Sequence, residues 1–362
     1  MLKCKRQQSV FKRFSFLFIF FCFNVFAGGL EKTVSSSVDR YTLFKDRIIT
    51  ERDLVNPKEH HHFLDIFLHS TSGLKSLIGE ISTANNPSSS TNDRSTNINS
   101  VLARNLNTGH FINIELGGAV AVSKFQFGQQ VLYPSFRFTF DVGAAMGVYS
   151  PSVSPVLLLY LKNDLKLGPH FYITHNEKWS SEVFIYKMTR SDLEVERDAT
   201  VLSSTTADPV SLDDLKLQEN SYRLDYALTF TDGKTEIEGK IAEYAIRKTA
   251  DKGFRSPYTT RPFLRGMVSR YFDSFYQWKL SAGLHHRSRY SIKDGIFLGL
   301  RVMKDPYPFQ FVGVLNSGYL TLRPAFRWHH LRFGYGIKVP VNNGEEGLWI
   351  PNSHIFHLQA SF

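Results

Sequence analysis

The feature of this sequence that most constrains its fold is a two-residue alternation of apolar and polar side chains over long segments. In "SFRFTFDVGAAMGV" (135–148), one set of alternate positions is apolar, and the residues between them are polar or small. A helix would mix the two sets, whereas a strand places them on opposite faces. The pattern returns repeatedly from about residue 108 to the end of the chain. This part of the chain is therefore predicted to consist mainly of β-strands.

These segments differ from the strands of a typical soluble sandwich. They run for about 9–14 residues, whereas strands in soluble proteins usually run for about 5–6. Their non-apolar face carries charged residues and glycine, and the apolar face often begins or ends in an aromatic residue. Long alternating strands with aromatic ends are typical of transmembrane β-barrels, which must close because no backbone polar group can stay unpaired in hydrocarbon.

We therefore expect an all-β fold, an antiparallel transmembrane barrel of fourteen strands within residues 108–362. The expected strands are 110–123, 134–149, 153–162, 165–175, 181–193, 221–231, 235–247, 262–272, 275–286, 292–303, 308–315, 319–328, 331–340 and 354–362. The pattern is weak in 153–175 and 262–272, so a barrel of twelve strands is the alternative. Short turns such as Asp232-Gly233 fall at one end and longer connections at the other, as expected if both chain ends face the periplasm.

The chain closes on an alternating segment with an aromatic last residue. Phe356, Leu358, Ala360 and Phe362 alternate with polar residues. This segment resembles the C-terminal strand of Gram-negative outer-membrane barrels, where a terminal phenylalanine is the recognition signal for the barrel-assembly machinery. The resemblance implies assembly by that machinery into outer-membrane lipid. His354 departs from the apolar pattern, and the resemblance identifies a class of barrels rather than one family.

Residues 1–27 have the pattern of a cleaved secretory signal peptide. A basic start is followed by the apolar run "FSFLFIFFCFNVF", and Val25 and Ala27 are small residues at the cleavage positions. The run is shorter than the about 20 residues of a membrane-spanning helix; an uncleaved anchor is the alternative. Both cysteines, Cys4 and Cys22, lie in this segment, so we expect an exported protein without disulfides.

The charge of the chain argues against a nucleic-acid-binding function. The net charge is +10, and the predicted signal peptide carries five of the positive charges. The rest of the chain is only mildly basic and shows no RNA-binding motif. We therefore expect no nucleic-acid partner.

Residues 28–107 are predicted to precede the barrel, either as a periplasmic segment or as a plug in its lumen. In "FLDIFLHSTSGLKSLIGEI" (63–81), apolar residues recur at near-helical spacing, which predicts one or two short amphipathic helices. Residues 83–100 are polar and of low complexity, which predicts a linker. The architecture resembles fourteen-stranded fatty-acid transporters with an N-terminal hatch, although none of their motifs is present; a disordered tail is the alternative.

The predicted inward face of the barrel is charged in two blocks. Later strands contribute mostly basic residues, and earlier strands contribute most of the acidic ones. The basic set is Lys279, Arg301, Arg323, Arg327, Arg332 and Lys338, and the acidic set is Glu115, Asp141, Asp225, Glu236 and Glu238. They predict either a water-filled pore with a transverse field and a preference for anions, or a narrow lumen filled by ion pairs.

The sequence predicts no metal site, cofactor or catalytic site. Adjacent histidines, as in "EHHHF" (59–63), do not converge on one ion. Ser281 and His285 share a strand face but lie about 13 Å apart at the usual rise, too far to pair. We expect a porin-like channel or transporter for small solutes rather than an enzyme. The alternatives are a structural or surface-interaction barrel with a filled lumen and, third, a membrane-embedded hydrolase.

Overall fold

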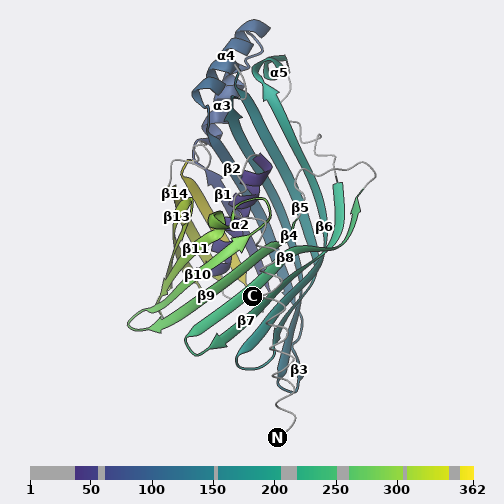
Figure 1. Ribbon diagram of the computed structural model, residues 1–362, viewed down its shortest axis with the longest axis vertical. Coiled ribbons are helices and arrows are strands. Elements are labelled where there is room, and N and C mark those ends of the chain that lie inside the picture. The colour runs from purple at the N-terminus through teal and green to yellow at the C-terminus, as the bar shows by residue number, and fades with distance from the viewer. Residues whose placement is uncertain are drawn as a thin grey trace.

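The computed structural model describes residues 37–55, 62–150, 154–204, 218–250, 261–304, 308–341 and 351–362. Within these ranges, fourteen strands form one closed antiparallel β-barrel (Figure 1). Each strand pairs with the next along the chain, and β1 (Phe63–Thr71) pairs with both β2 and β15 and so closes the barrel. The predicted fold class is confirmed. The predicted signal peptide, both cysteines and residues 59–61 of the histidine run lie outside the described residues.

The wall strands differ in length, and the longest lie in the first half of the chain. After β1 they are β2 Gly109–Ala121, β4 Gln130–Tyr149, β5 Val156–Thr174, β6 Trp179–Asp198, β7 Gln218–Asp232, β8 Thr235–Ala250, β9 Phe263–Asp273, β10 Gln277–His286, β11 Ile296–Met303, β12 Phe309–Asn316, β13 Tyr319–Trp328, β14 Leu331–Pro340 and β15 Ser353–Ser361. The short strand β3 (Phe125–Phe127) pairs only with β4 and extends the hairpin between β2 and β4.

The predicted number of strands is right, but two predicted strands are one. Residues 156–162 and 165–174 of the two predicted ranges belong to the single strand β5. Their predicted break, Lys162-Asn163-Asp164, continues the strand because Lys162 and Asp164 both face the lumen, where their charged groups pair at 2.7 Å. In the sequence, a pair of charged residues that neutralise each other in the lumen is therefore mistaken for a turn.

The fourteenth wall strand is β1. For the first half of the range 63–81, the prediction of a helix is therefore wrong. Phe67 and His69 of β1 are buried, and Leu64 and Leu68 between and beside them are exposed, which is a strand alternation. Only the second half is helical, as α3 (Leu74–Ala84). The barrel therefore begins at residue 63 rather than near residue 108.

The outer face of the barrel is an apolar belt. Large apolar side chains that point outward on many strands are exposed, and they include Leu64, Leu68, Ile114, Leu116, Phe136, Phe140, Leu165, Leu167, Val268, Leu280, Leu298, Leu320, Leu322, Phe333, Ile337 and Val339. A continuous belt of this kind is stable against lipid and unstable against water. Among the described residues, no helix is both long and apolar enough to cross a membrane.

The two ends of the barrel differ. Helices α3, α4 (Thr91–Arg104) and α5 (Ala199–Ser204) lie together at the end that carries the longer connections (Figure 1). The opposite end carries short turns, and there the Phe362 N–H donates to the carbonyl oxygen of His62 at 2.8 Å. The prediction of a linker over 83–100 is wrong for α4, because Ser90 caps that helix and Ile98 and Leu102 are buried against α3 and α5.

Candidate functional site

Helix α2 (Ser37–Val55) lies inside the barrel (Figure 1). Most of its described side chains are buried, and Tyr41, Leu43 and Asp46 are fully inaccessible to solvent, whereas Ile49, Arg52 and Asp53 are half-buried. The helix runs along the lumen, from the β10–β11 connection, where Asp39 pairs with Arg289, towards β8 and β9, where Asp53 lies. Since α2 belongs to no wall strand, it is a separate body that fills this part of the lumen.

One stripe of α2 is apolar. Val38, Tyr41, Phe44 and Ile48 follow helical spacing and pack against the inner side of the wall. Their wall partners include Phe67, Phe111, Tyr160, Tyr319 and Ile355, from β1, β2, β5, β13 and β15. Two apolar contacts lie on other sides of α2: Leu43 packs against Tyr290, and Leu54 packs against a wall cluster that consists of Met267, Phe297, Val312 and Val314. The other positions of the helix are mostly polar or charged, so the apolar contacts of α2 are interrupted by charged ones.

Gly143 of β4 makes room for this stripe. A Cβ atom added at Gly143 would lie 1.7 Å from the Tyr41 hydroxyl oxygen, which no side chain can occupy without movement. The Tyr41 hydroxyl donates a hydrogen bond to Asn113 Oδ1 at 3.0 Å in the same place. The glycine therefore fixes how closely α2 approaches the wall.

Gly143→Val is expected to push α2 away from β4, at a cost of about 1–3 kcal/mol, the usual range for overpacking. Trypsin should then cut at the lysine and arginine residues of α2 while the barrel stays intact in detergent. Gly266→Val is the matched control, because a Cβ at Gly266 meets no atom within 4 Å. Equal protection of α2 in both variants would contradict this account.

Ion pairs join α2 to the wall around most of the circumference. Each involves one charged residue of the helix and one or more from β2, β4, β8, β9, β14 or the β10–β11 connection. They are Asp39–Arg289 at 2.6 Å, Asp46–Arg287 at 2.9 Å, Glu51–Lys338 at 2.8 Å, Asp53 with Lys240 and Arg265 at 2.7 Å each, and the contacts Lys45–Asp141 and Arg52–Glu115.

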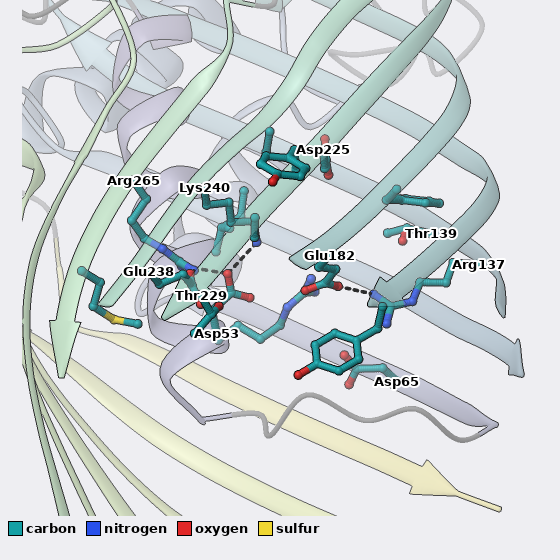
Figure 2. Close-up of a pocket in the computed structure, with 18 of the residues that line it drawn as sticks. Asp53, Asp65, Arg137, Thr139, Glu182, Asp225, Thr229, Glu238, Lys240 and Arg265 are labelled. Atoms are coloured by element: carbon teal, nitrogen blue, oxygen red, sulfur yellow. Dashed lines mark hydrogen bonds and ion pairs between the residues drawn. The ribbon is translucent and has the colours of Figure 1, made fainter. Parts of the chain in front are cut away.

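Near the C-terminal end of α2, the half-buried carboxyl group of Asp53 lies next to two basic side chains. Burial opposes ionisation of this carboxyl, but the ammonium group of Lys240 and the guanidinium group of Arg265 outweigh it and hold the pKa of Asp53 well below its usual range. The Arg265 guanidinium group also contacts Glu238. Asp53 is therefore ionised and tied to two neighbouring strands, as Figure 2 shows.

The β10–β11 connection folds onto α2 and holds it through Asp46. Arg287 donates from Nε and Nη2 to the two carboxylate oxygens of Asp46, at 2.9 Å each, and from Nη1 to Glu243 at 2.9 Å. The Tyr290 hydroxyl also donates to Asp46, at 2.9 Å. Burial and the Asp46 carboxylate raise the pKa of Tyr290 well above its usual value, so this phenol stays protonated.

Glu243 reaches this network through an irregularity in β8. Its backbone adopts a left-handed conformation (φ 57°), and the pairing of β7 with β8 shifts register nearby. Ala242 and Glu243 are consequently both buried, although neighbours on a regular strand point to opposite faces. Glu243 also accepts from Lys166 at 2.8 Å. The alternation rule gives no sign of this residue, because it applies only to regular strands.

A cavity of about 500 Å³ lies beside the C-terminal half of α2 (Figure 2). Lys45, Ile49, Arg52 and Asp53 of the helix form one side, and inward residues of the wall form the rest. Thr231 and Glu236, which flank a short turn, line it too, so the cavity lies in the half of the lumen nearer the short turns.

The structure places most of the predicted lumen residues around this cavity. Its lining includes the acidic residues Glu115, Asp141, Asp225, Glu236 and Glu238 and the basic residues Lys279 and Arg301. The other basic residues lie apart from it: Arg323, Arg332 and Lys338 are buried elsewhere, and Arg327 is exposed near the end of β13.

The acidic residues of this set have partners rather than forming an open wall. Glu236 pairs with Lys279 at 2.8 Å, and Asp141 pairs with Lys162 at 3.1 Å. Asp225 accepts a hydrogen bond from the Tyr186 hydroxyl at 2.9 Å. The charges of the lumen are thus largely compensated in this structure, as in the ion-paired alternative.

The C-terminal residues form the strand next to β1. Phe356 and Leu358 lie opposite Tyr335 and Phe333 of β14, and Phe362 is exposed at the end with short turns. The terminal side chain is thus accessible, and its role as an assembly signal stays a prediction.

The structure gives the predicted histidine and serine positions separate partners. Ser281 Oγ lies 2.8 Å from Ser269 Oγ, and His285 Nδ1 lies 2.9 Å from the Tyr290 hydroxyl. Among the described residues, no group of three or more histidine, cysteine or acidic side chains is arranged to hold a metal ion.

A closed antiparallel barrel with an apolar outer belt and a polar lumen has the architecture of outer-membrane β-barrels. No protein-family model matches the sequence, and no curated protein matches it. The fold is similar to those of several solved barrels at very low sequence identity.

Three of these structures illustrate the similarity. The "TodX deltaS2S3 mutant monoaromatic hydrocarbon channel" has a TM-score of 0.44 and 7% identity, over 86% of this chain and 91% of that one. The transport unit of the autotransporter AIDA-I from Escherichia coli has a TM-score of 0.38 and 8% identity, over 92% and 99%. CdiB from Acinetobacter baumannii has a TM-score of 0.37 and 9% identity over 83% of this chain, which spans only 60% of the CdiB chain.

Proposed function

We propose that this protein is a channel or transporter for small solutes in the outer membrane of a Gram-negative bacterium, closed by α2 and opened when α2 moves. A cleaved signal peptide exports it, the barrel-assembly machinery inserts it, and the end with short turns faces the periplasm. The observation that carries this proposal is the position of α2. This helix is not part of the barrel wall, lies in the lumen and is joined to the wall largely by ion pairs.

The chemistry of these ties suits a reversible plug. A buried ion pair gains Coulomb energy but loses the hydration of both charges, so its net contribution to stability is small. When α2 leaves, its charged residues and the inward-facing charges of the wall both regain water. The apolar stripe of α2 opposes this movement, so the closed state is favoured without being permanent.

The cavity supports transport of small polar solutes. Its volume of about 500 Å³ lies within the usual range of small-molecule sites, about 300–1,000 Å³. Its lining carries both charges and hydroxyl groups, for example Thr139, Tyr172 and Glu238. A solute that enters from the short-turn end therefore meets a polar chamber that ends at α2.

A chemical lock on α2 tests this proposal. Arg47 Nη2 of α2 lies 2.9 Å from Ser317 Oγ in the β12–β13 turn, so Arg47→Cys and Ser317→Cys are within reach of a short bismaleimide. The experiment uses the chain without residues 1–27, which removes Cys4 and Cys22. In planar bilayers, the double variant should show opening steps that disappear after cross-linking.

The matched control places the same cross-link on the outside of the gate. Lys178 and Asp232 form an exposed pair at 2.7 Å between two short turns, and Lys178→Cys with Asp232→Cys should leave the opening steps unchanged after cross-linking. Opening steps that persist with α2 locked would reject α2 as the gate. Complete absence of steps in every variant would favour the structural barrel with a filled lumen.

A further inference from the structure

We infer that the wall of the lumen carries a hydrolytic site for small carboxylic esters, formed by Ser135, His170 and Glu182. Ser135 Oγ lies 3.0 Å from His170 Nδ1, and His170 Nε2 lies 2.7 Å from Glu182 Oε1. A serine, a histidine within hydrogen-bond reach and an acid that orients the histidine are the parts of a nucleophilic triad. This activity is separate from the proposed gating by α2.

Three neighbouring strands bring these residues together. Ser135 of β4 lies directly opposite His170 of β5, and Glu182 of β6 lies opposite Tyr172, one alternate position from His170. All three side chains therefore point into the lumen from adjacent strands. Ser135 and His170 are 35 positions apart in the chain, and His170 and Glu182 are 12 positions apart, so no local sequence motif indicates the site.

The carboxylate fixes the state of the imidazole. An ionised carboxylate only accepts hydrogen bonds, so the proton of a neutral His170 lies on Nε2 and is donated to Glu182. Nδ1 then has a free lone pair, which accepts the hydroxyl proton of Ser135. His170 itself is buried and held in place from both sides, as a general base requires.

Arg137 supplies the positive charge that such a site needs. It lies two residues after Ser135 on β4 and faces the same side of the sheet. Its Nη1 donates to Glu182 at 3.0 Å, and its Nε is buried and has no hydrogen-bond partner among the described residues. A guanidinium group beside the nucleophile can stabilise the negative oxygen of a tetrahedral intermediate.

The surroundings indicate the class of substrate. Arg137 and Glu182 line the lumen cavity, and Figure 2 shows their side chains meeting there. The rings of Tyr133 and Tyr172, with centroids 6.0 Å apart, lie next to Ser135 and His170 on the side of the short turns. This aromatic pair suits an aryl or short acyl group, so the substrate is a small ester that enters from that end.

The reaction needs only water as a second substrate. Ser135 Oγ attacks the carbonyl carbon while His170 Nδ1 takes its proton, and the resulting oxyanion faces Arg137. The ester C–O bond then breaks, and His170 returns the proton to the departing alcohol. Water attacks the acyl-serine with His170 as base, which releases the carboxylic acid and restores the Ser135 hydroxyl.

A covalent probe tests the site without any mutation. The purified full-length barrel is treated with a small aryl sulfonyl fluoride, and tryptic peptides are analysed by mass spectrometry. The label should fall on Ser135, and p-nitrophenyl acetate hydrolysis should stop in proportion to labelling. The cross-linked double variant Arg47→Cys with Ser317→Cys, which serves here only to separate this proposal from the gating proposal, should be labelled on Ser135 as well.

Variants separate nucleophile, positioning residue and scaffold. Ser135→Ala should abolish both labelling and turnover. Glu182→Gln should keep the fold, slow turnover roughly 10²- to 10⁴-fold, and change the pH profile of labelling, because the amide donates as well as accepts and no longer selects one tautomer. A merely structural role for Glu182 would leave that pH profile unchanged.

A second serine–histidine pair provides the matched control. Ser181 Oγ lies 2.8 Å from His175 Nε2, and Ser181→Ala should leave labelling and turnover as in the unmodified protein. Labelling of Ser181 in place of Ser135 would overturn the proposal. So would the absence of label on Ser135 in a protein that shows β-barrel circular dichroism and resists unfolding in cold detergent.

Discussion

A chain that lacks residues 37–55 is expected to show long-lived single-channel steps in planar bilayers, whereas the full chain stays closed most of the time. The reason is that α2 lies in the lumen, between the two open ends of the barrel, and packs against the inner side of the wall. Without the helix, inward charges such as Asp141, Lys240 and Lys338 lose their α2 partners and face water instead. A polar wall tolerates this exchange far better than an apolar one would.

The boundaries of this deletion matter. β1 begins at Phe63 and closes the barrel between β2 and β15, so a cut that continued past residue 62 would open the wall itself. Deletion of residues 91–104 is the matched control, because it removes α4 at the far end of the barrel and leaves the lumen untouched. Equal conductance of the two deletion variants would show that α2 is not what closes the channel.

The wall strands could be predicted from the sequence because their environment imposes a local rule. Lipid on one face and a polar lumen on the other require alternate residues to differ in polarity, whatever the partner strands are. The strands at 319–328 and 331–340 accordingly have the predicted bounds. The apolar face of 135–148 likewise points outward, with Phe136 and Phe140 exposed.

The features that local alternation missed depend on distant parts of the chain. β1 was not predicted because its strand partners, β2 and β15, are distant in the sequence. The apolar residues in its nine positions also fit the spacing of a helix. The break predicted inside β5 arose from lumen charges that pair with each other. One strand was missed and another was predicted as two, so the predicted total of fourteen strands is correct although the predicted strands are not all the observed ones.

The lumen was the least predictable part, since its contacts are between side chains far apart in the sequence. The alternation identified Asp141 and Glu238 as inward-facing, but not that α2 would supply or share their partners. Glu243 was missed because a bulge turns it inward. Ser135 and His170 were missed because only the register of β4 and β5 makes them neighbours.

Arg287→Met should be the most destabilising single substitution of a charged residue at the α2 interface. It removes three hydrogen bonds to carboxylate oxygens and leaves Asp46 and Glu243, both buried, without this cation. Removal of one partner from a buried ion pair typically costs about 3–5 kcal/mol. The free energy of unfolding, measured by denaturant titration of the barrel in detergent micelles, should fall by this order.

Lys178→Met is the matched control, because Lys178 and Asp232 are both more than half exposed. Exposed pairs contribute about 0–1 kcal/mol, so this variant should unfold almost like the unmodified protein. Adding Asp46→Leu to Arg287→Met should recover part of the loss, since the double variant buries one uncompensated charge fewer. If Arg287→Met costs no more than Lys178→Met, the β10–β11 connection does not hold α2 in the lumen, and the apolar stripe that includes Tyr41 and Phe44 must do so instead.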